Sequence, residues 1–122
     1  MKEELKQGIR EFIQSASLAE ENNLLISACD NYFKALVHAL DVFIYCLIGK
    51  LPDSHGDRFR ILEKRNPELY RIVDGIFSLY RKSYRSTVSK EELSEVKHAL
   101  RETLRITGLE KEFVGYLEKR KK

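Results

Sequence analysis

The sequence contains few of the residues that interrupt helices. Its 122 residues include six glycines, two prolines, two cysteines and no tryptophan. So little glycine and proline argues against a turn-rich β-sandwich and against a collagen-like or linker-rich chain. A chain of this length can form one hydrophobic core without disulfides or a metal, so we expect residues 1–122 to be a single domain.

The two cysteines do not form a metal or redox motif. Cys29 and Cys46 are not in a Cys-x-x-Cys spacing, and both fall in what we interpret as one helix. At about 1.5 Å rise per residue they would lie roughly 25 Å apart, too far for a disulfide. We expect both thiols to be buried, which fits a reducing compartment. The N-terminus has no apolar stretch of a secretion signal, so we expect a cytoplasmic location.

Charge of neither sign dominates the chain. Hydrophobic residues make up 43% of the chain and charged residues 34%. The chain is therefore too apolar to be disordered and too charged to be an integral membrane protein. The net charge of +3 is carried by the tail 118–122, so no basic field extends over the chain to hold a nucleic acid duplex. The tail is either a solvated helix end or a nucleic-acid arm.

Apolar residues recur with the helical period of about 3.6 along most of the chain, and no segment alternates as a strand does. Asn66 before Pro67 predicts one helix start, and Ser89 with Glu92 forms a capping box at another. We expect helices over about residues 2–21, 24–48, 58–65, 67–84, 90–106 and from 109 onward.

This pattern predicts an all-α fold, an antiparallel up-and-down four-helix bundle with a short extra helix and a C-terminal helical extension. The bundle would span about residues 2–106 and the extension 109–122. The segment 24–48 is the most apolar, but charged residues interrupt it, so we expect a central core helix rather than a membrane span. The expected core includes Phe33, Leu36, Leu40, Ile76 and Leu100.

A polar stripe runs along the otherwise apolar segment 24–48. Lys34, His38 and Asp41 lie on it within an arc of roughly 100°. In one interpretation Asp30–Lys34 and His38–Asp41 are local helix pairs at a hydrated seam. In the other, the stripe lines a cleft that a ligand or partner enters.

The fourth expected helix has a polar face that carries Asp74, Arg81 and Arg85. We expect this face and the polar stripe to share a cleft. Asp41 and Asp74 would orient the cations there, while the two arginines would bind phosphate through their planar guanidinium groups. In the alternative, Arg81 only pairs with Asp74 or Ser78 on a solvated surface.

Motifs of known catalytic chemistry are missing from the sequence. It has no P-loop, GxGxxG, HExxH or GxSxG. We therefore expect neither a metal nor a cofactor. His98 falls on a solvated helix face, and His55 lies in a loop where it would cap the short helix or contact a phosphate.

Three stretches stand in a particular order: ACDNYFKALVHALDVFIYCLIG (28–49), LPDSHGDRFRIL (51–62) and LYRKSYRSTVSKEELSEVKHAL (79–100). They resemble the second helix, the Ser-His loop before a short third helix, and the fourth and capped final helices of the HEPN family of small prokaryotic helical domains. The resemblance covers about residues 25–105. It implies a four-helix bundle that forms a homodimer with a polar cleft, a role in nucleotide or RNA recognition, and often a separate minimal nucleotidyltransferase partner.

The chain departs from the ribonuclease members of that family. Those members carry an Arg followed a few residues later by His, commonly Arg-Asn-x-x-x-His. Here Arg81 is followed by Lys-Ser-Tyr-Arg-Ser-Thr-Val, and Arg85 has no His within reach either. Acid–base cleavage of RNA needs a group that titrates near neutral pH, which Arg does not supply.

We therefore expect a non-catalytic binding module that takes a nucleotide or a nucleotidyltransferase partner. Lys34, His38, Arg81 and Arg85 would supply its anion contacts. The alternatives are a degenerate ribonuclease toxin that uses Arg81 and His38, and a purely structural interaction domain.

The helix at 24–48 also bears on assembly. It is apolar around more of its circumference than two flanking helices need to cover. We expect the excess to form a homodimer surface that includes Phe43, Leu47 and nearby Tyr80.

Overall fold

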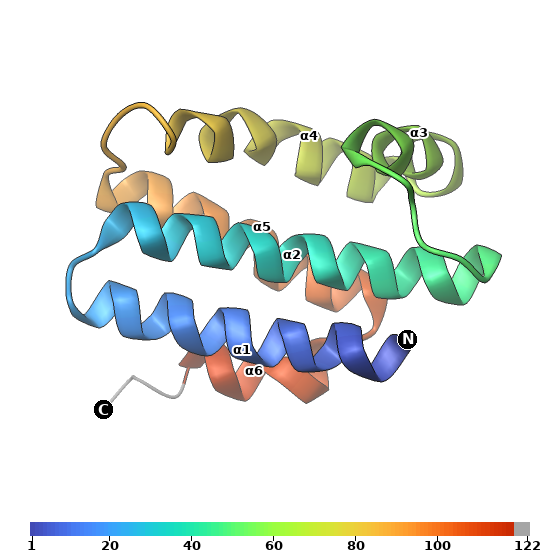
Figure 1. Ribbon diagram of the computed structural model, residues 1–122, viewed down its shortest axis with the longest axis horizontal. Coiled ribbons are helices and arrows are strands. Elements are labelled where there is room, and N and C mark those ends of the chain that lie inside the picture. The colour runs from blue at the N-terminus through green and yellow to red at the C-terminus, as the bar shows by residue number, and fades with distance from the viewer. Residues whose placement is uncertain (119–122) are drawn as a thin grey trace.

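A computed structural model describes residues 1–118 of the chain, and every regular element in that range is an α-helix (Figure 1). This confirms the all-α prediction. The helices are α1 (Lys2–Glu21), α2 (Leu25–Ile48), α3 (His55–Arg65), α4 (Pro67–Lys82), α5 (Lys90–Thr107) and α6 (Glu110–Glu118). The last four residues of the expected extension, which carry the positive charges of the tail, lie outside the described residues.

Most helix ends fall where the local signals place them. The Asn66 side chain accepts a hydrogen bond from the Leu69 amide at 3.0 Å, and Ser89 and Glu92 form both bonds of a capping box. Gly49 and Gly108 end α2 and α5 in the left-handed conformation, with φ of 79° and 81°. These interactions are local in sequence, which is why the sequence predicts them.

Helix α3 begins three residues earlier than predicted. The Ser54 side chain accepts a hydrogen bond from the Asp57 amide at 3.1 Å and caps the helix, so α3 starts at His55. Helix α4 ends two residues earlier than predicted, at Lys82, and the chain continues in hydrogen-bonded turns.

Helix α2 is the centre of the packing. Helices α1 and α5 lie along it, α4 also contacts it, and α6 packs on α1 and α5 (Figure 1). The predicted core residues are all buried: Phe33, Leu36, Leu40, Ile76 and Leu100. By length and composition alone, α2 could also cross a membrane, but half of its most apolar 18-residue window is buried inside this fold.

The prediction that both cysteines are buried is wrong for one of them. Cys29 is buried, but Cys46 is exposed. The last turn of α2 extends past the first turn of α1, so this end of the central helix lacks a neighbour on one side (Figure 1). Helical periodicity does not reveal where a flanking helix stops.

Candidate functional site

A groove of about 480 Å³ lies where α2, the loop after it, α3 and α4 meet. Three of the predicted site residues line it: Lys34, His38 and Asp41. Its other lining residues are partly aromatic and partly polar: Phe12, Phe33, Val37, Pro52, Asp53, Ser54, His55, Arg58 and Tyr80. We call this hollow the central groove.

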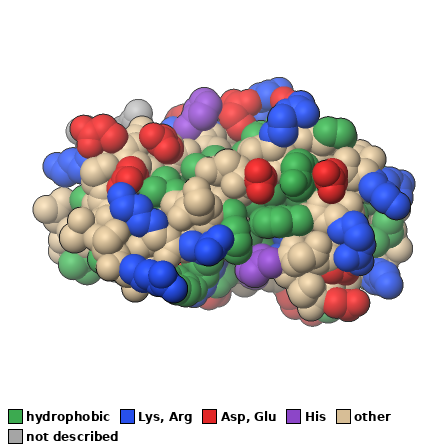
Figure 2. Space-filling model, turned by 90° about the horizontal axis from the view of Figure 1, so that it is seen from above, with side chains coloured by type: hydrophobic (Ala, Val, Ile, Leu, Met, Phe, Trp, Pro, Cys, Tyr) green, Lys and Arg blue, Asp and Glu red, His purple; other side chains and the backbone are tan. Residues whose placement is uncertain are grey.

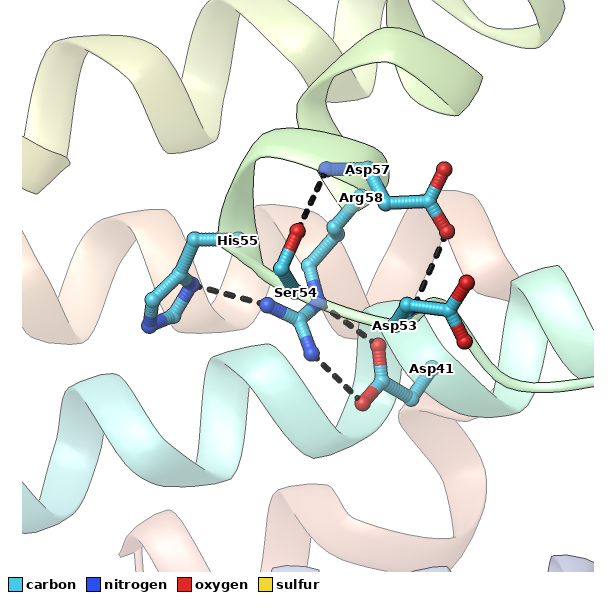
Figure 3. A network of polar contacts seen from close by, with 6 residues as sticks. All are labelled: Asp41, Asp53, Ser54, His55, Asp57 and Arg58. Carbon is cyan, nitrogen blue, oxygen red and sulfur yellow. Dashed lines mark hydrogen bonds and ion pairs between the residues drawn. The ribbon is translucent and has the colours of Figure 1, made fainter.

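A buried ion pair forms part of the central groove (Figure 3). Arg58 donates from Nε to Oδ1 of Asp41 at 2.7 Å and from Nη2 to Oδ2 at 2.9 Å. Each of the two side chains is 10% exposed. Nη1 of Arg58 lies 2.8 Å from Nδ1 of His55. Because a guanidinium group can only donate, Nδ1 must accept, and the proton of the neutral imidazole is on Nε2.

The first turn of α3 positions Arg58 for this contact. Besides the Ser54 cap, the Asp57 carboxylate accepts a hydrogen bond from the Asp53 amide at 2.9 Å, so the loop is tied to the helix (Figure 3). Arg58 precedes the fully buried Leu62 by one helical turn and therefore lies on the same, inward face. Our sequence analysis missed Arg58. The Ser-x-x-Asp spacing of residues 54–57 is the signal that locates the helix start and hence this face.

His38 packs closely against α1. A Cβ atom placed on Gly8 would lie only 2.5 Å from Cδ2 of His38, and the Phe12 ring meets the imidazole edge-on at 5.2 Å. Burial is the largest effect on His38 and lowers its pKa. The Asp41 carboxylate and then the Lys34 backbone carbonyl oppose this, and Arg58 has the smallest effect, which also lowers the pKa. The pKa of His55 is lowered as well, by burial and then by Arg58. Both imidazoles are therefore neutral at pH 7.

Of the two side-chain pairs expected along the polar stripe of α2, one is present and the other is not. Lys34 pairs with Asp30 at 3.3 Å, as one interpretation predicts. Among the described residues no hydrogen bond joins His38 to Asp41, and both carboxylate oxygens of Asp41 bind Arg58. With two cations and two carboxylates in its lining, the central groove has no net formal charge.

A separate hollow of about 370 Å³ lies at the end of α4 and holds the two predicted phosphate-binding residues, Arg81 and Arg85. Ser78, Lys82 and Tyr84 complete its lining, and we call it the basic pocket. The Arg81 guanidinium stands 5.8 Å from the centre of the Phe77 ring. Figure 2 shows several Lys and Arg side chains together in the lower left of this face, where α4 ends.

The single cleft expected from the sequence is thus divided in two. The Tyr80 ring stacks on Phe33 at 4.1 Å, and Phe77 lies 5.4 Å from His55. These rings of α4 pack against α2 and α3, and the predicted residues of the two helices line different hollows. Asp74 is exposed on α4 and lines neither hollow.

The remaining expectations concern metals and His98. Within residues 1–118 no group of three or more His, Cys, Asp or Glu side chains could hold a metal ion. His98 is exposed on α5, as predicted. Comparisons of the chain with protein-family models, with curated proteins and with solved structures find no match.

Proposed function

We propose that the protein is a non-catalytic binding module of the HEPN type whose basic pocket takes the phosphate of a nucleotide or of an RNA segment. One observation carries this proposal. Arg81 and Arg85 form no ion pair within the described part of the chain, and the lining of their pocket includes no acidic residue. Guanidinium groups without a carboxylate partner keep their donors available, and their planar forks match a phosphate.

The proposal includes the architecture and assembly that go with this family. Helices α1, α2, α4 and α5 would form the antiparallel up-and-down bundle, with α3 as the extra helix and α6 as the extension. The contacts of α2 with α1, α5 and α4 support this assignment. The module would be cytoplasmic and homodimeric, with a minimal nucleotidyltransferase as a partner protein.

The geometry favours binding over catalysis. A degenerate ribonuclease would need His38 and Arg81 on the same ligand, but the two residues line different hollows. His38 is also half-covered by α1, where Gly8 and Phe12 lie against its ring. The purely structural domain remains as the outcome of a negative binding test.

Titration of the basic pocket tests the proposal. Calorimetry with a panel of mononucleotides and a short RNA would compare the wild type with Arg81→Ala and Arg85→Ala. Each charge-assisted bond contributes roughly 1.5–3 kcal/mol, so we expect each substitution to weaken binding about tenfold or more. Arg71→Ala is the matched control, because this exposed arginine of α4 lies beside Glu68, Glu95 and Glu102 instead.

Two results would contradict the proposal. If Arg71→Ala weakens binding as much as Arg81→Ala does, the effect is one of general charge and not of this pocket. If the wild type binds none of these ligands, the pocket is not a phosphate site and a protein-only partner becomes the better hypothesis.

A further inference from the structure

An apolar groove of about 620 Å³ lies beside the basic pocket. The start of α2 contributes Leu24 and Ile26 to it, and the loop between α4 and α5 contributes Thr87 and Val88. Leu24 and Ile26 are 57% and 45% exposed, unusually high values for large aliphatic side chains. Tyr84 belongs to the lining of both hollows, so the apolar groove and the basic pocket share a wall.

The Tyr84 ring is exposed and yet held in place. It is 69% exposed, and its hydroxyl group is hydrogen-bonded to that of Tyr80. The two rings meet edge-on at 5.2 Å, and the Tyr84 amide donates to the Arg81 carbonyl at 3.2 Å. The amide of Arg85 in turn donates to Lys82 at 2.9 Å. These bonds fix an aromatic face within one turn of both arginines.

We infer that the two hollows form one site for a nucleotide, with its phosphate on Arg81 and Arg85 and its base in the apolar groove against Tyr84. The inference rests on the proposed function and adds a binding site for the base, which the two arginines do not contact. A flat ring stacks on an aromatic side chain whichever base it belongs to. The two hollows share Tyr84, so a ligand that joins an apolar ring to a phosphate can occupy both.

The polar residues in the lining of the apolar groove favour a base over a hydrocarbon chain. Asn23, Ser27 and Asp30 lie in the lining together with the aliphatic residues. The edge of a base offers hydrogen-bond donors and acceptors to such groups. A hydrocarbon chain would cover them without offering any, which is unfavourable.

The experiment separates the base from the phosphate. Inorganic phosphate, ribose 5-phosphate and the four mononucleotides AMP, GMP, CMP and UMP are titrated against the wild type, Tyr84→Leu, Tyr84→Phe and Tyr45→Leu. Tyr45 is the matched control, since it lies on α2 outside both hollows. In the wild type we expect at least one nucleotide to bind roughly tenfold more tightly than ribose 5-phosphate.

The variants then assign that preference to the Tyr84 ring. In each protein the preference is the ratio of its affinities for the nucleotide and for ribose 5-phosphate, so a general change in phosphate binding cancels. We expect Tyr84→Leu to abolish this preference and Tyr84→Phe and Tyr45→Leu to keep it. The inference is overturned if the wild type binds every nucleotide no better than ribose 5-phosphate, or if Tyr84→Leu retains the preference. In both cases phosphate binding that depends on Arg81 would leave the proposed function standing. If no phosphate compound binds at all, both proposals are wrong.

Discussion

At the scale of single residues, the contact between Arg58 and Asp41 is an ion pair in the interior of the fold. Both side chains are nine-tenths buried, and two hydrogen bonds join them. A buried pair adds little over apolar residues of the same volume, but removing one partner leaves an uncompensated buried charge. Its main consequence is therefore positional, because it ties α3 to α2 beside the central groove.

Substitution of one partner should be far more damaging than substitution of both. We expect Asp41→Asn to lower the free energy of unfolding by about 3–5 kcal/mol, as measured by urea denaturation. The double variant Asp41→Leu with Arg58→Met should be more stable than Asp41→Asn. As a control, Asp30→Asn breaks the more exposed pair with Lys34 and should change stability by less than about 1 kcal/mol. If Asp41→Asn and Asp30→Asn lower the free energy of unfolding equally, burial of the pair between Asp41 and Arg58 does not affect stability.

Two histidines beside this pair make the stability depend on pH. The pKa values of His38 and His55 are both lowered in the fold from the ordinary value of 6.5, mainly by burial. The unfolded chain therefore binds protons at a higher pH than the folded one does. By linkage, the stability is fully present above pH 6.5 and is lost as pH falls through the two lowered pKa values.

Urea denaturation between pH 8 and pH 5 would measure this loss. We expect the free energy of unfolding to decrease below pH 6.5 in the wild type and to decrease less steeply in His38→Gln. His98→Gln, which removes an exposed histidine, should follow the wild-type curve. A wild-type stability that rises on acidification through this range would contradict the direction of both shifts.

At the scale of helices, the contact of α1 with α2 depends on a glycine. Gly8 lies in the interior of α1, where glycine disfavours the helix, but the His38 ring occupies the space of its missing side chain. Gly75 of α4 is also inside a helix, yet a Cβ atom there meets nothing within 4 Å. The same substitution therefore has different effects at the two positions.

Thermal or urea denaturation of two alanine variants would show the difference. We expect Gly75→Ala to stabilise the protein by up to about 1 kcal/mol through helix propensity alone. Gly8→Ala should be less stable than Gly75→Ala by about 1–3 kcal/mol, because the His38 ring must shift. Replacing His38 with Ala in the Gly8→Ala background should remove most of this penalty. If the two glycine substitutions change stability by the same amount, the His38 ring moves aside at no energetic cost.

The helices and their buried faces could be predicted from the sequence, while the way side chains pack between the helices could not. Caps such as Ser89 with Glu92 and the apolar periodicity are local, so the helices form where the sequence places them. The division of the candidate site depends instead on Phe77 and Tyr80. Periodicity does not show that the rings of these two residues pack against α2 and α3. Arg58 was missed for a related reason, since its inward face follows only once α3 is known to start after Ser54.

At the scale of the whole molecule, the central groove has no net formal charge, whereas the basic pocket carries unpaired arginines. Opposite charges that pair within a site hold its side chains in place, whereas unpaired positive charges attract an anionic ligand. The sequence as a whole, with a net charge of +3, does not show this difference. The difference appears only when the fold pairs Asp41 with Arg58 and leaves Arg81 and Arg85 without a carboxylate in their pocket.

The expected homodimer surface includes residues near the C-terminal end of α2. Tyr80, one of the three residues expected at a dimer interface, packs inward on Phe33. Leu47 is 39% exposed at the end of α2, and Phe43 is half-buried one turn earlier. A second copy could cover these side chains together with the exposed Cys46. The proposed homodimer therefore uses the end of α2 that extends past α1.

Sedimentation velocity tests this interface directly. We expect the wild type at micromolar concentration to sediment as a dimer of the 14.3 kDa chain. Leu47→Lys should shift it toward the monomer, because a buried ammonium group would have to lose its hydration at the interface. Leu18→Lys is the matched control, since Leu18 is 62% exposed on α1, away from this end of α2. A wild type that sediments only as a 14.3 kDa species would refute the dimer, and equal dissociation by the two variants would place the interface elsewhere.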